Sequence, residues 1–298
     1  MVTRRASLGA MAFAALSTTG AAWAAEQEPA SLSRSVAWVM EPQGDASRAQ
    51  LVQVAWPDGE PPPGGFPVMI LLDGQNTFPM AVAALRAQER RSEVTRVRPA
   101  IIVGLSGIKD GVHDGEARAR DYTVAAPTAP PGTGGADAFL AFIEDELKPA
   151  LEQHFLVDRD RYALFGHSYG GMFVLHALFT RPGSFRRMIA ASPSIWWQEG
   201  ALLKDEPHLM AQPRAMLSQM GLLVPVGGDE SPDAPGLAEE RRARMRITRM
   251  QGRARELVER LTAAGLPSEY LEFPGENHGS VIAPAVGRAM RFALGPQA

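Results

Sequence analysis

The sequence has no cysteine, and neither sign of charge is in large excess. Without cysteine there can be no disulfide bond, no thiolate metal site and no lipid anchor on an N-terminal thiol. The formal net charge is −3, from 30 Lys and Arg against 33 Asp and Glu, which argues against a general nucleic-acid-binding protein. The 29 glycines and 24 prolines follow no fixed period, which excludes a collagen-like chain. With 298 residues, 45% of them hydrophobic, the chain is long enough to form one large core.

An export signal is predicted at the N-terminus, over residues 1–24. A positively charged start with Arg4-Arg5 is followed by an alanine-rich apolar stretch and by Ala22-Trp23-Ala24, which places small residues at −3 and −1 of a cleavage site. The paired arginines are typical of the twin-arginine route, but Ser7 stands where phenylalanine is usual, so that route and general export both stay open. We expect a mature chain of residues 25–298 that is periplasmic or secreted. No stable membrane insertion is expected, because no other segment has the roughly 18 consecutive apolar residues of a span.

Apolar runs alternate with amphipathic stretches along the rest of the chain. Strands are predicted at 35–40, 51–56, 67–72, 99–105, 162–165, 188–191, 222–226 and 269–273. Helices are predicted at 79–91, 137–155, 170–179 and 239–264, with a last helix after Ser280. This alternation favours an α/β fold, with a mostly parallel sheet of about eight strands and helices on both faces. Residues 107–135 are rich in glycine and proline without a period, which predicts a long functional loop. No linker divides the chain, so a single domain is expected.

A serine in a sharp turn between a predicted strand and a predicted helix is the candidate nucleophile. Gly166-His167-Ser168-Tyr169-Gly170-Gly171 directly follows the apolar run at 162–165 and opens the next helix. The pattern Gly-x-Ser-x-Gly is that of a nucleophile elbow, where glycines are needed because backbone segments approach closely. The serine oxygen then lies above a helix N-terminus, whose dipole and free amides favour a developing negative charge.

A serine nucleophile needs a general base, and His278 is the histidine in the expected place. It lies in Gly275-Glu276-Asn277-His278-Gly279-Ser280, between the last predicted strand and the last helix. In the chain order serine, acid, histidine, the base belongs on that loop. His167 lies inside the elbow and His176 inside an apolar helix, so both are interpreted as packing residues.

The acid that orients this base should follow the predicted strand at 222–226. Asp229 and Glu230 are adjacent there, and adjacent residues on a turn point in different directions, so only one of them can face His278. Asp233 is a third, less favoured candidate. The spacing does not decide between them.

Two backbone amides are expected to form an oxyanion hole. One is the amide of Tyr169, directly after the candidate nucleophile. The other should come from the loop after the third strand, Leu71-Leu72-Asp73-Gly74-Gln75. Gly74 allows a tight turn there, and the amide of Gln75 is the candidate donor.

Several blocks of the sequence resemble the putative-esterase family, which includes esterase D, antigen 85 and siderophore esterases. The blocks are the elbow, Leu71-Leu72-Asp73-Gly74, Arg120-Asp121-Tyr122-Thr123, Ser192-Pro193-Ser194-Ile195-Trp196-Trp197 and Glu276-Asn277-His278-Gly279-Ser280-Val281. The last two are similar to the branch of ferric-enterobactin and bacillibactin esterases, which cleave trilactone siderophores. The resemblance implies an α/β-hydrolase fold with Ser168 as nucleophile and His278 as base. In this branch the acid region usually reads Gly-x-x-Glu, which falls on Gly227 and Glu230.

Two arginines and two tryptophans are the candidate substrate-binding residues. A ferric catecholate siderophore is anionic, so its site should gather basic side chains, and Arg118 and Arg120 precede the family-like Asp-Tyr-Thr block. The same arginines could pair with Glu116 and Asp121 instead. Trp196-Trp197 could offer flat apolar walls to an aromatic group or could pack in the core.

Three functions stay open. The first is a serine carboxylester hydrolase that works through an acyl-enzyme, on siderophore-type trilactones or on other aryl or alkyl esters. The second is an acyltransferase resembling antigen 85, and the third is a non-catalytic binding protein of the same fold. The expected partner is a small-molecule ester. No cofactor and no metal ion are expected, since no His, Asp and Glu cluster has the spacing of a metal site.

Overall fold

A single β-sheet runs through the described part of the chain, which comprises residues 31–109 and 112–296 of a computed structural model. Its strands are β1 (Ser35–Met40), β2 (Gln50–Ala55), β3 (Phe66–Leu72), β4 (Ile101–Lys109), β5 (Val112–His113), β6 (Val157–His167), β7 (Arg187–Ala191), β8 (Gly221–Gly227) and β9 (Ser268–Phe273). All of them belong to the unit that begins at Ser33. The predicted export signal at 1–24 lies outside the described residues.

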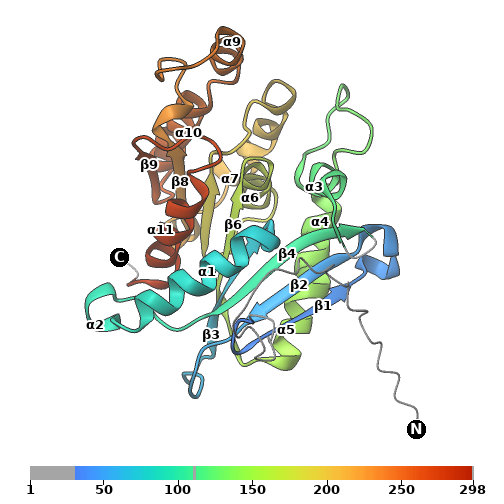
Figure 1. Cartoon of the computed structure of the whole chain (residues 1–298), viewed down its shortest axis with the longest axis vertical. Helices are drawn as coiled ribbons and strands as arrows, with labels where there is room; N and C mark the ends of the chain where they lie inside the picture. Colours follow the sequence, from blue (N-terminus) through green and yellow to red (C-terminus); the bar gives the residue numbers. More distant parts are fainter. Residues whose placement is uncertain (1–30, 110–111, 297–298) are drawn as a thin grey trace, which may run out of the picture. The chain divides into compact units, whose positions relative to one another are not determined.

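The sheet is mostly parallel, as the sequence predicted. The strand order is β1-β2-β4-β3-β6-β7-β8-β9, and the short β5 pairs with β4 beside this path (Figure 1). β2 is antiparallel to both β1 and β4, whereas every pair from β4 through β3 to β9 is parallel. The α/β class is therefore confirmed. Because parallel strands end at one edge of the sheet, the residues that follow β3, β6, β8 and β9 meet there.

Helices connect the strands. They are α1 (Gly74–Glu89), α2 (Ser92–Thr95), α3 (Gly115–Tyr122), α4 (Ala136–Phe142), α5 (Lys148–His154), α6 (Tyr169–Thr180), α7 (Glu206–Met210), α8 (Arg214–Leu217), α9 (Glu239–Thr248), α10 (Met250–Ala264) and α11 (Ile282–Leu294). None of the helices in the described ranges is long and apolar enough to cross a membrane.

The central strands of the sheet are buried on both faces. All seven residues of β3 and all seven of β8 are buried, and a sheet with such strands needs cover on both faces. On one face α1 and α11 pack against each other and against central strands. On the other face α4, α5, α6 and α10 contribute apolar side chains to the main core.

The prediction of one long loop over 107–135 was wrong. β4 continues to Lys109, and helix α3 begins after Asp114. The Asp114 side chain accepts a hydrogen bond from the Glu116 amide, which caps the helix N-terminus. Among the described residues of this segment, Asp114 and residues 123–135 have neither helix nor strand. The arginines of the segment are therefore fixed on a helix.

The helix predicted over 239–264 is two helices. α9 and α10 are separated at Arg249, which has a φ of 47° and so lies in the left-handed region. α10 packs in the core through Ala254, Leu257 and Leu261, whereas no residue of α9 is buried. α9 therefore projects beyond the carboxyl edge of the sheet (Figure 1).

One residue, Ser168, connects β6 to α6. Its backbone has a φ of 60° and a ψ of −113°, and such a conformation costs an L-residue on the order of 1–3 kcal/mol. The turn is possible because Gly166 has no side chain: a Cβ atom there would lie 2.2 Å from the carbonyl oxygen of Gly170. The glycine before the serine is a steric requirement of the turn.

Gly166→Ala is therefore expected to lower the free energy of unfolding by about 3 kcal/mol, because the added methyl group meets fixed backbone. Urea unfolding followed by circular dichroism measures it. Gly287→Ala is the control: Gly287 lies inside α11 with no atom within 4 Å of the added Cβ, and this change should stabilise the protein by roughly 0.5–1 kcal/mol. Equal unfolding midpoints for Gly166→Ala and the wild type would contradict the steric argument.

Candidate active site

Backbone hydrogen bonds hold Ser168 in its turn. Its amide donates to the carbonyl of Ala191 (2.9 Å), and its carbonyl accepts from the amides of Met172 (3.0 Å) and Ser194 (3.1 Å). Ala191 is the last residue of β7, and Ser194 lies in the segment that follows it. These bonds from neighbouring elements fix the serine at the carboxyl edge of the sheet.

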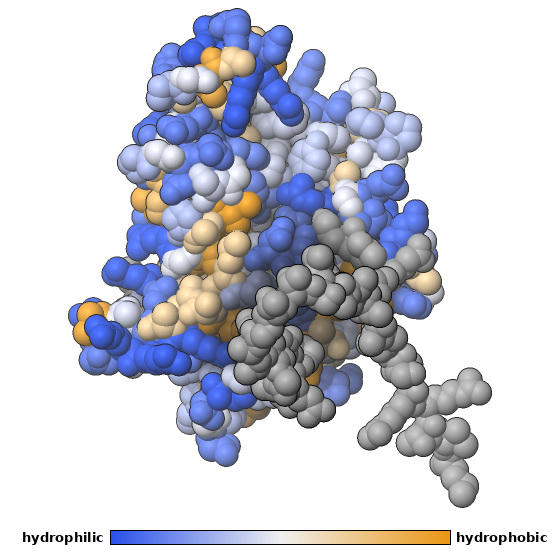
Figure 2. All heavy atoms as spheres, in the orientation of Figure 1, coloured by the Kyte–Doolittle hydropathy of each residue, from blue (hydrophilic) through white to orange (hydrophobic). Residues whose placement is uncertain are grey.

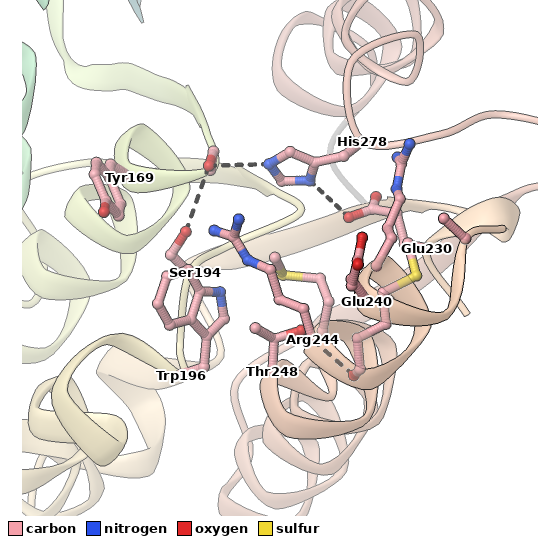
Figure 3. Close-up of a pocket in the computed structure, with 13 residues that line it drawn as sticks. Tyr169, Ser194, Trp196, Glu230, Glu240, Arg244, Thr248 and His278 are labelled. Atoms are coloured by element: carbon pink, nitrogen blue, oxygen red, sulfur yellow. Dashed lines mark hydrogen bonds and ion pairs between the residues drawn. The ribbon is translucent and has the colours of Figure 1, made fainter. Parts of the chain in front are cut away.

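Three side chains that the sequence analysis selected lie in hydrogen-bonding contact. His278 Nε2 is 3.0 Å from Ser168 Oγ, and His278 Nδ1 is 2.7 Å from Glu230 Oε2 (Figure 3). Ser168 follows β6, Glu230 follows β8 and His278 follows β9. The parallel strands thus bring the three groups to one point of the sheet edge.

Glu230, and not Asp229, is the carboxylate that faces His278. The turn Gly228–Glu230 after β8 directs the Glu230 side chain back toward the sheet, where its Oε1 accepts from the Gly227 amide at 2.8 Å and from the Ser192 hydroxyl. Asp229 is held by its backbone amide, which donates to the carbonyl of Glu276 (2.9 Å). Asp233 uses its amide to donate to Ser231 Oγ.

The carboxyl of Glu230 is charged at neutral pH, although it is only 4% exposed. Burial by itself would raise its pKa, because the charge is removed from water. Hydrogen bonds from His278, Ser192 and the Gly227 amide oppose that effect and hold the pKa below its ordinary value. The resulting carboxylate can fix the tautomer of His278 and stabilise positive charge on its ring.

His167 packs against His278, as the sequence analysis interpreted it. The two ring centroids are 4.6 Å apart. Burial, and next the positive charge of His278, lower the pKa of His167 to about 3. His167 is therefore neutral at neutral pH and supports the His278 ring without adding a like charge.

The two predicted oxyanion donors differ in their surroundings. Tyr169 is the first residue of α6, so its amide has no acceptor within the helix. The amide of Gln75 donates to Ser106 Oγ (2.9 Å), and this hydroxyl in turn donates to Gln75 Oε1 (2.5 Å). The Gln75 amide thus already has a partner inside the protein.

The sequence predicts that Gly74 makes the turn between β3 and α1, but Asp73 makes it instead. Asp73 has a φ of 56° and takes the left-handed conformation. Gly74 serves close packing instead, since a Cβ atom there would lie 2.7 Å from the carbonyl carbon of Gly104.

Neither Arg118 nor Arg120 lines the cavity at Ser168. Arg118 Nε donates to Asp73 Oδ1 (2.8 Å), and its Nη2 donates to the carbonyl of His167 (3.0 Å). Arg120 makes two hydrogen bonds to Asp121, at 2.9 and 3.0 Å. Both carboxylates are buried, and a buried charge requires a partner. Helix α3 therefore directs these arginines inward, and only the predicted pair of Arg120 with Asp121 is present.

The sequence left open whether the two tryptophans line a cavity or pack in the core, and the structure has one of each kind. Trp196 lines the cavity. Trp197 is 6% exposed, and its Nε1 donates to the carbonyl of Val124 (3.2 Å). Its ring contacts that of Tyr169 edge-on at 5.2 Å, so it supports the residue after Ser168.

The cavity at Ser168 has a volume of about 630 Å³. Residues of the elbow and of the segment after β7 form one wall, and helix α9 forms the opposite wall (Figure 3). Its lining residues are Ser168, Tyr169, Ser194, Trp196, Glu230, Ala238, Glu240, Arg241, Arg244, Met245, Thr248, Met250 and His278. Sequence reasoning missed the contribution of α9 and of Ser194, whose hydroxyl lies 3.4 Å from Ser168 Oγ. The arginine-rich segment that follows the acid was the available signal for α9.

Within the ranges that the structure covers, no group of three or more His, Asp or Glu side chains is placed to hold a metal ion. What the geometry defines is a strand-to-helix serine elbow, followed in chain order by a buried acid and a histidine at the carboxyl edge of a parallel sheet. That is the architecture of an α/β hydrolase.

Comparison with known proteins identifies the family within that class. The pattern of the putative-esterase family matches residues 46–282, and the chain belongs to this family. It is 38% identical over 263 residues to the ferri-bacillibactin esterase BesA of Bacillus subtilis. That alignment covers 84% of this chain and 86% of the relative. It is 34% identical over 264 residues to the siderophore triacetylfusarinine C esterase of Aspergillus fumigatus, with 83% and 89% covered. The crystal structure of the BES protein from Bacillus cereus is similar, with a TM-score of 0.77, 33% identity, and 91% and 99% of the two chains covered. The protein is an esterase, as the sequence predicted.

Arg118→Ala is expected to lower the free energy of unfolding by about 3 kcal/mol, because it leaves the buried Asp73 carboxylate without its partner. It should also reduce turnover of anionic and neutral esters by the same factor, since Arg118 holds backbone and does not line the cavity. Arg159→Ala is the control: Arg159 pairs with Glu152 and its side chain is 76% exposed, so its loss should cost under about 1 kcal/mol. Unchanged stability with a loss confined to the anionic ester would return Arg118 to substrate binding.

Proposed function

We propose that the protein is a serine esterase in which Ser168 is the nucleophile, His278 the general base and Glu230 the acid of a catalytic triad. The observation that carries this proposal is the continuous hydrogen-bonded chain from Glu230 Oε2 through both ring nitrogens of His278 to Ser168 Oγ, at 2.7 and 3.0 Å. A serine hydroxyl is a poor nucleophile at neutral pH, and this chain supplies the base and the orientation that it needs.

The reaction runs through an acyl-enzyme. Ser168 Oγ attacks the ester carbonyl carbon while His278 Nε2 takes the hydroxyl proton. The amide of Tyr169 donates to the oxyanion that forms. The intermediate collapses when the bond to the alcohol oxygen breaks, and His278 gives its proton to that oxygen. A water molecule then attacks the acyl-serine with His278 again as base, which releases the carboxylic acid and restores Ser168.

We propose that the substrates are siderophore-type esters, trilactones in particular, with other aryl or alkyl esters as the wider class. The names of the two curated relatives, a ferri-bacillibactin esterase and a triacetylfusarinine C esterase, support this choice. The cavity of about 630 Å³ is of the size that takes an organic ligand. Trp196 gives its wall a flat apolar surface.

We also propose that the protein acts outside the cytoplasm, in the periplasm or as a secreted enzyme. The support is the sequence of residues 1–24, in which paired arginines, an apolar stretch and Ala22-Trp23-Ala24 follow one another as in an export signal. The mature chain would begin at Ala25.

Ser168→Ala should reduce ester turnover by roughly four orders of magnitude or more, because no other group can form the acyl bond. Release of nitrophenol from a short nitrophenyl ester measures it. A serine-reactive fluorophosphonate should add its mass to the wild type on the peptide that contains Ser168 and should leave the variant unmodified. Turnover above a few per cent of wild type in the variant, or label on another serine, would reject the assignment.

Glu230→Gln should reduce kcat by roughly 10³-fold, whereas Asp229→Asn is the matched control and should stay within about twofold of wild type. Similar losses in the two variants would show that Glu230 does not orient the base.

A further inference from the structure

Two adjoining cavities lie at the amino edge of the sheet, opposite the edge that carries Ser168. Their volumes are about 830 and 750 Å³, and Met220 and Pro296 line both of them. Their walls come from the first residues of β6, β7, β8 and β9 and from the segments before these strands. α2 and the end of α11 lie at this end of the molecule, far from α9 (Figure 1). Since a strand rises about 3.3 Å per residue, Arg161 near the start of β6 is roughly 20 Å from Ser168.

Arginine dominates the charge of these two cavities, which we call the arginine basin. Arg159 pairs with Glu152, and Arg288 pairs with Glu269. Among the lining carboxylates, Asp158 and Asp160 are outside any ion pair in the described ranges. Six lining arginines are also outside any ion pair there: Arg96, Arg98, Arg161, Arg186, Arg187 and Arg291. The basin thus holds six such cations against two such anions.

Several guanidinium groups of the basin lie close enough to repel one another. Burial, and next the positive charge of Arg98, lower the pKa of Arg161, while Asp158 opposes this change. Burial and the positive charges of Arg186 and Arg161 likewise lower the pKa of Arg187. Like charges that are gathered together cost free energy. An anion with several charges would relieve that repulsion on binding.

The basin contains both fixed and available guanidinium groups. Arg186 donates to Gln219 Oε1 (3.0 Å), and Arg187 donates to the carbonyls of Arg186 and Gln219 (2.9 and 3.0 Å). The segment before β8 therefore fixes these two side chains. In the residues that the structure describes, the side chains of Arg98 and Arg161 make no hydrogen bond and no ion pair, so their donors are available to a ligand.

The shape of the basin favours a soluble ligand over a membrane surface. Its arginines line cavities, which take a molecule of limited size. The surface around α2, at the lower left of Figure 2, is mostly hydrophilic. Val94 is a strongly exposed apolar side chain in the lining, and a single valine does not form the broad apolar face of an interfacial helix.

We propose that the arginine basin is a second binding site of this protein, for a soluble molecule that carries several phosphate groups, such as an oligophosphate. A guanidinium group presents two parallel N–H donors that match the oxygens of a phosphate. A single phosphate group contacts one or two arginines, whereas linked phosphates contact several at once and gain affinity from the linkage. The site does not depend on the esterase reaction, because it lies at the other edge of the sheet.

Isothermal titration calorimetry with sodium tripolyphosphate and with orthophosphate tests this site. Tripolyphosphate should bind the wild type at least about tenfold more tightly than orthophosphate. Its affinity should fall about tenfold or more as NaCl rises from about 0.05 M to about 0.5 M, because salt screens the arginines. Turnover of a neutral nitrophenyl ester should stay within about twofold at saturating tripolyphosphate. Ser168→Ala should bind it like the wild type, which separates this inference from the proposed function.

Variants of single arginines locate the site. Arg98→Gln and Arg161→Gln should each weaken tripolyphosphate binding about tenfold or more, since each removes a charge-assisted contact. Arg159→Gln is the matched control: Arg159 lines the same cavity, but it pairs with Glu152 and its side chain is 76% exposed. Its affinity should stay within about threefold of wild type. Circular dichroism checks that every variant is folded.

Four outcomes would overturn the inference. The first is unchanged affinity in both Arg98→Gln and Arg161→Gln. The second is inhibition of ester turnover with binding lost in Arg241→Gln/Arg244→Gln, which would place the anion in the cavity at Ser168. The third is sedimentation with phosphatidylglycerol vesicles without binding of tripolyphosphate, which would indicate a lipid surface. The fourth is a tenfold gain in affinity on deletion of the two residues after Pro296, which would show that they occupy the basin.

Discussion

The strained backbone of Ser168 is the constraint on which the rest of the site depends. A conformation with φ 60° and ψ −113° persists only where the surroundings determine it. α6 is buried from Gly170 to Phe179, so the helix cannot shift to relieve the turn. β7 and the segment after it are bonded to both peptide groups of Ser168. The packing of a large core thus keeps one hydroxyl at the sheet edge, where the residues after β8 and β9 can reach it.

Each buried charge near this turn has a fixed partner, and the two main pairs act differently. Glu230 contacts the ring of His278, so it acts on a group that exchanges protons. Asp73 contacts Arg118, which also binds the carbonyl of His167. That second pair connects the loop after β3 to the last residue of β6, and it therefore keeps the two segments that frame Ser168 at a constant separation. Both of these guanidinium contacts are to the protein, and Arg118 does not line the cavity at Ser168.

Local patterns predicted the strands, the elbow and the place of His278 after the last strand, because each depends on residues that are neighbours in sequence. The sequence could not show which carboxylate faces His278, since Asp229 and Glu230 are adjacent and the residues that hold the Glu230 side chain, Ser192 and His278, are far away in the sequence. Arg118 was a candidate for substrate binding or for a pair with a nearby carboxylate, whereas its partner Asp73 is 45 positions away in the sequence. The break at Arg249 was missed, because helical periodicity does not show a single left-handed residue.

The exposed position of α9 has a consequence for how this protein can change over evolutionary time. Substitutions in the core or at the elbow disturb packing on which the whole sheet depends. By contrast, a substitution on α9 removes no buried side chain, so selection can act on it with little penalty in folding. The wall of the cavity can therefore be rebuilt by exchanging a few surface residues of one helix, while the core and the elbow are inherited unchanged.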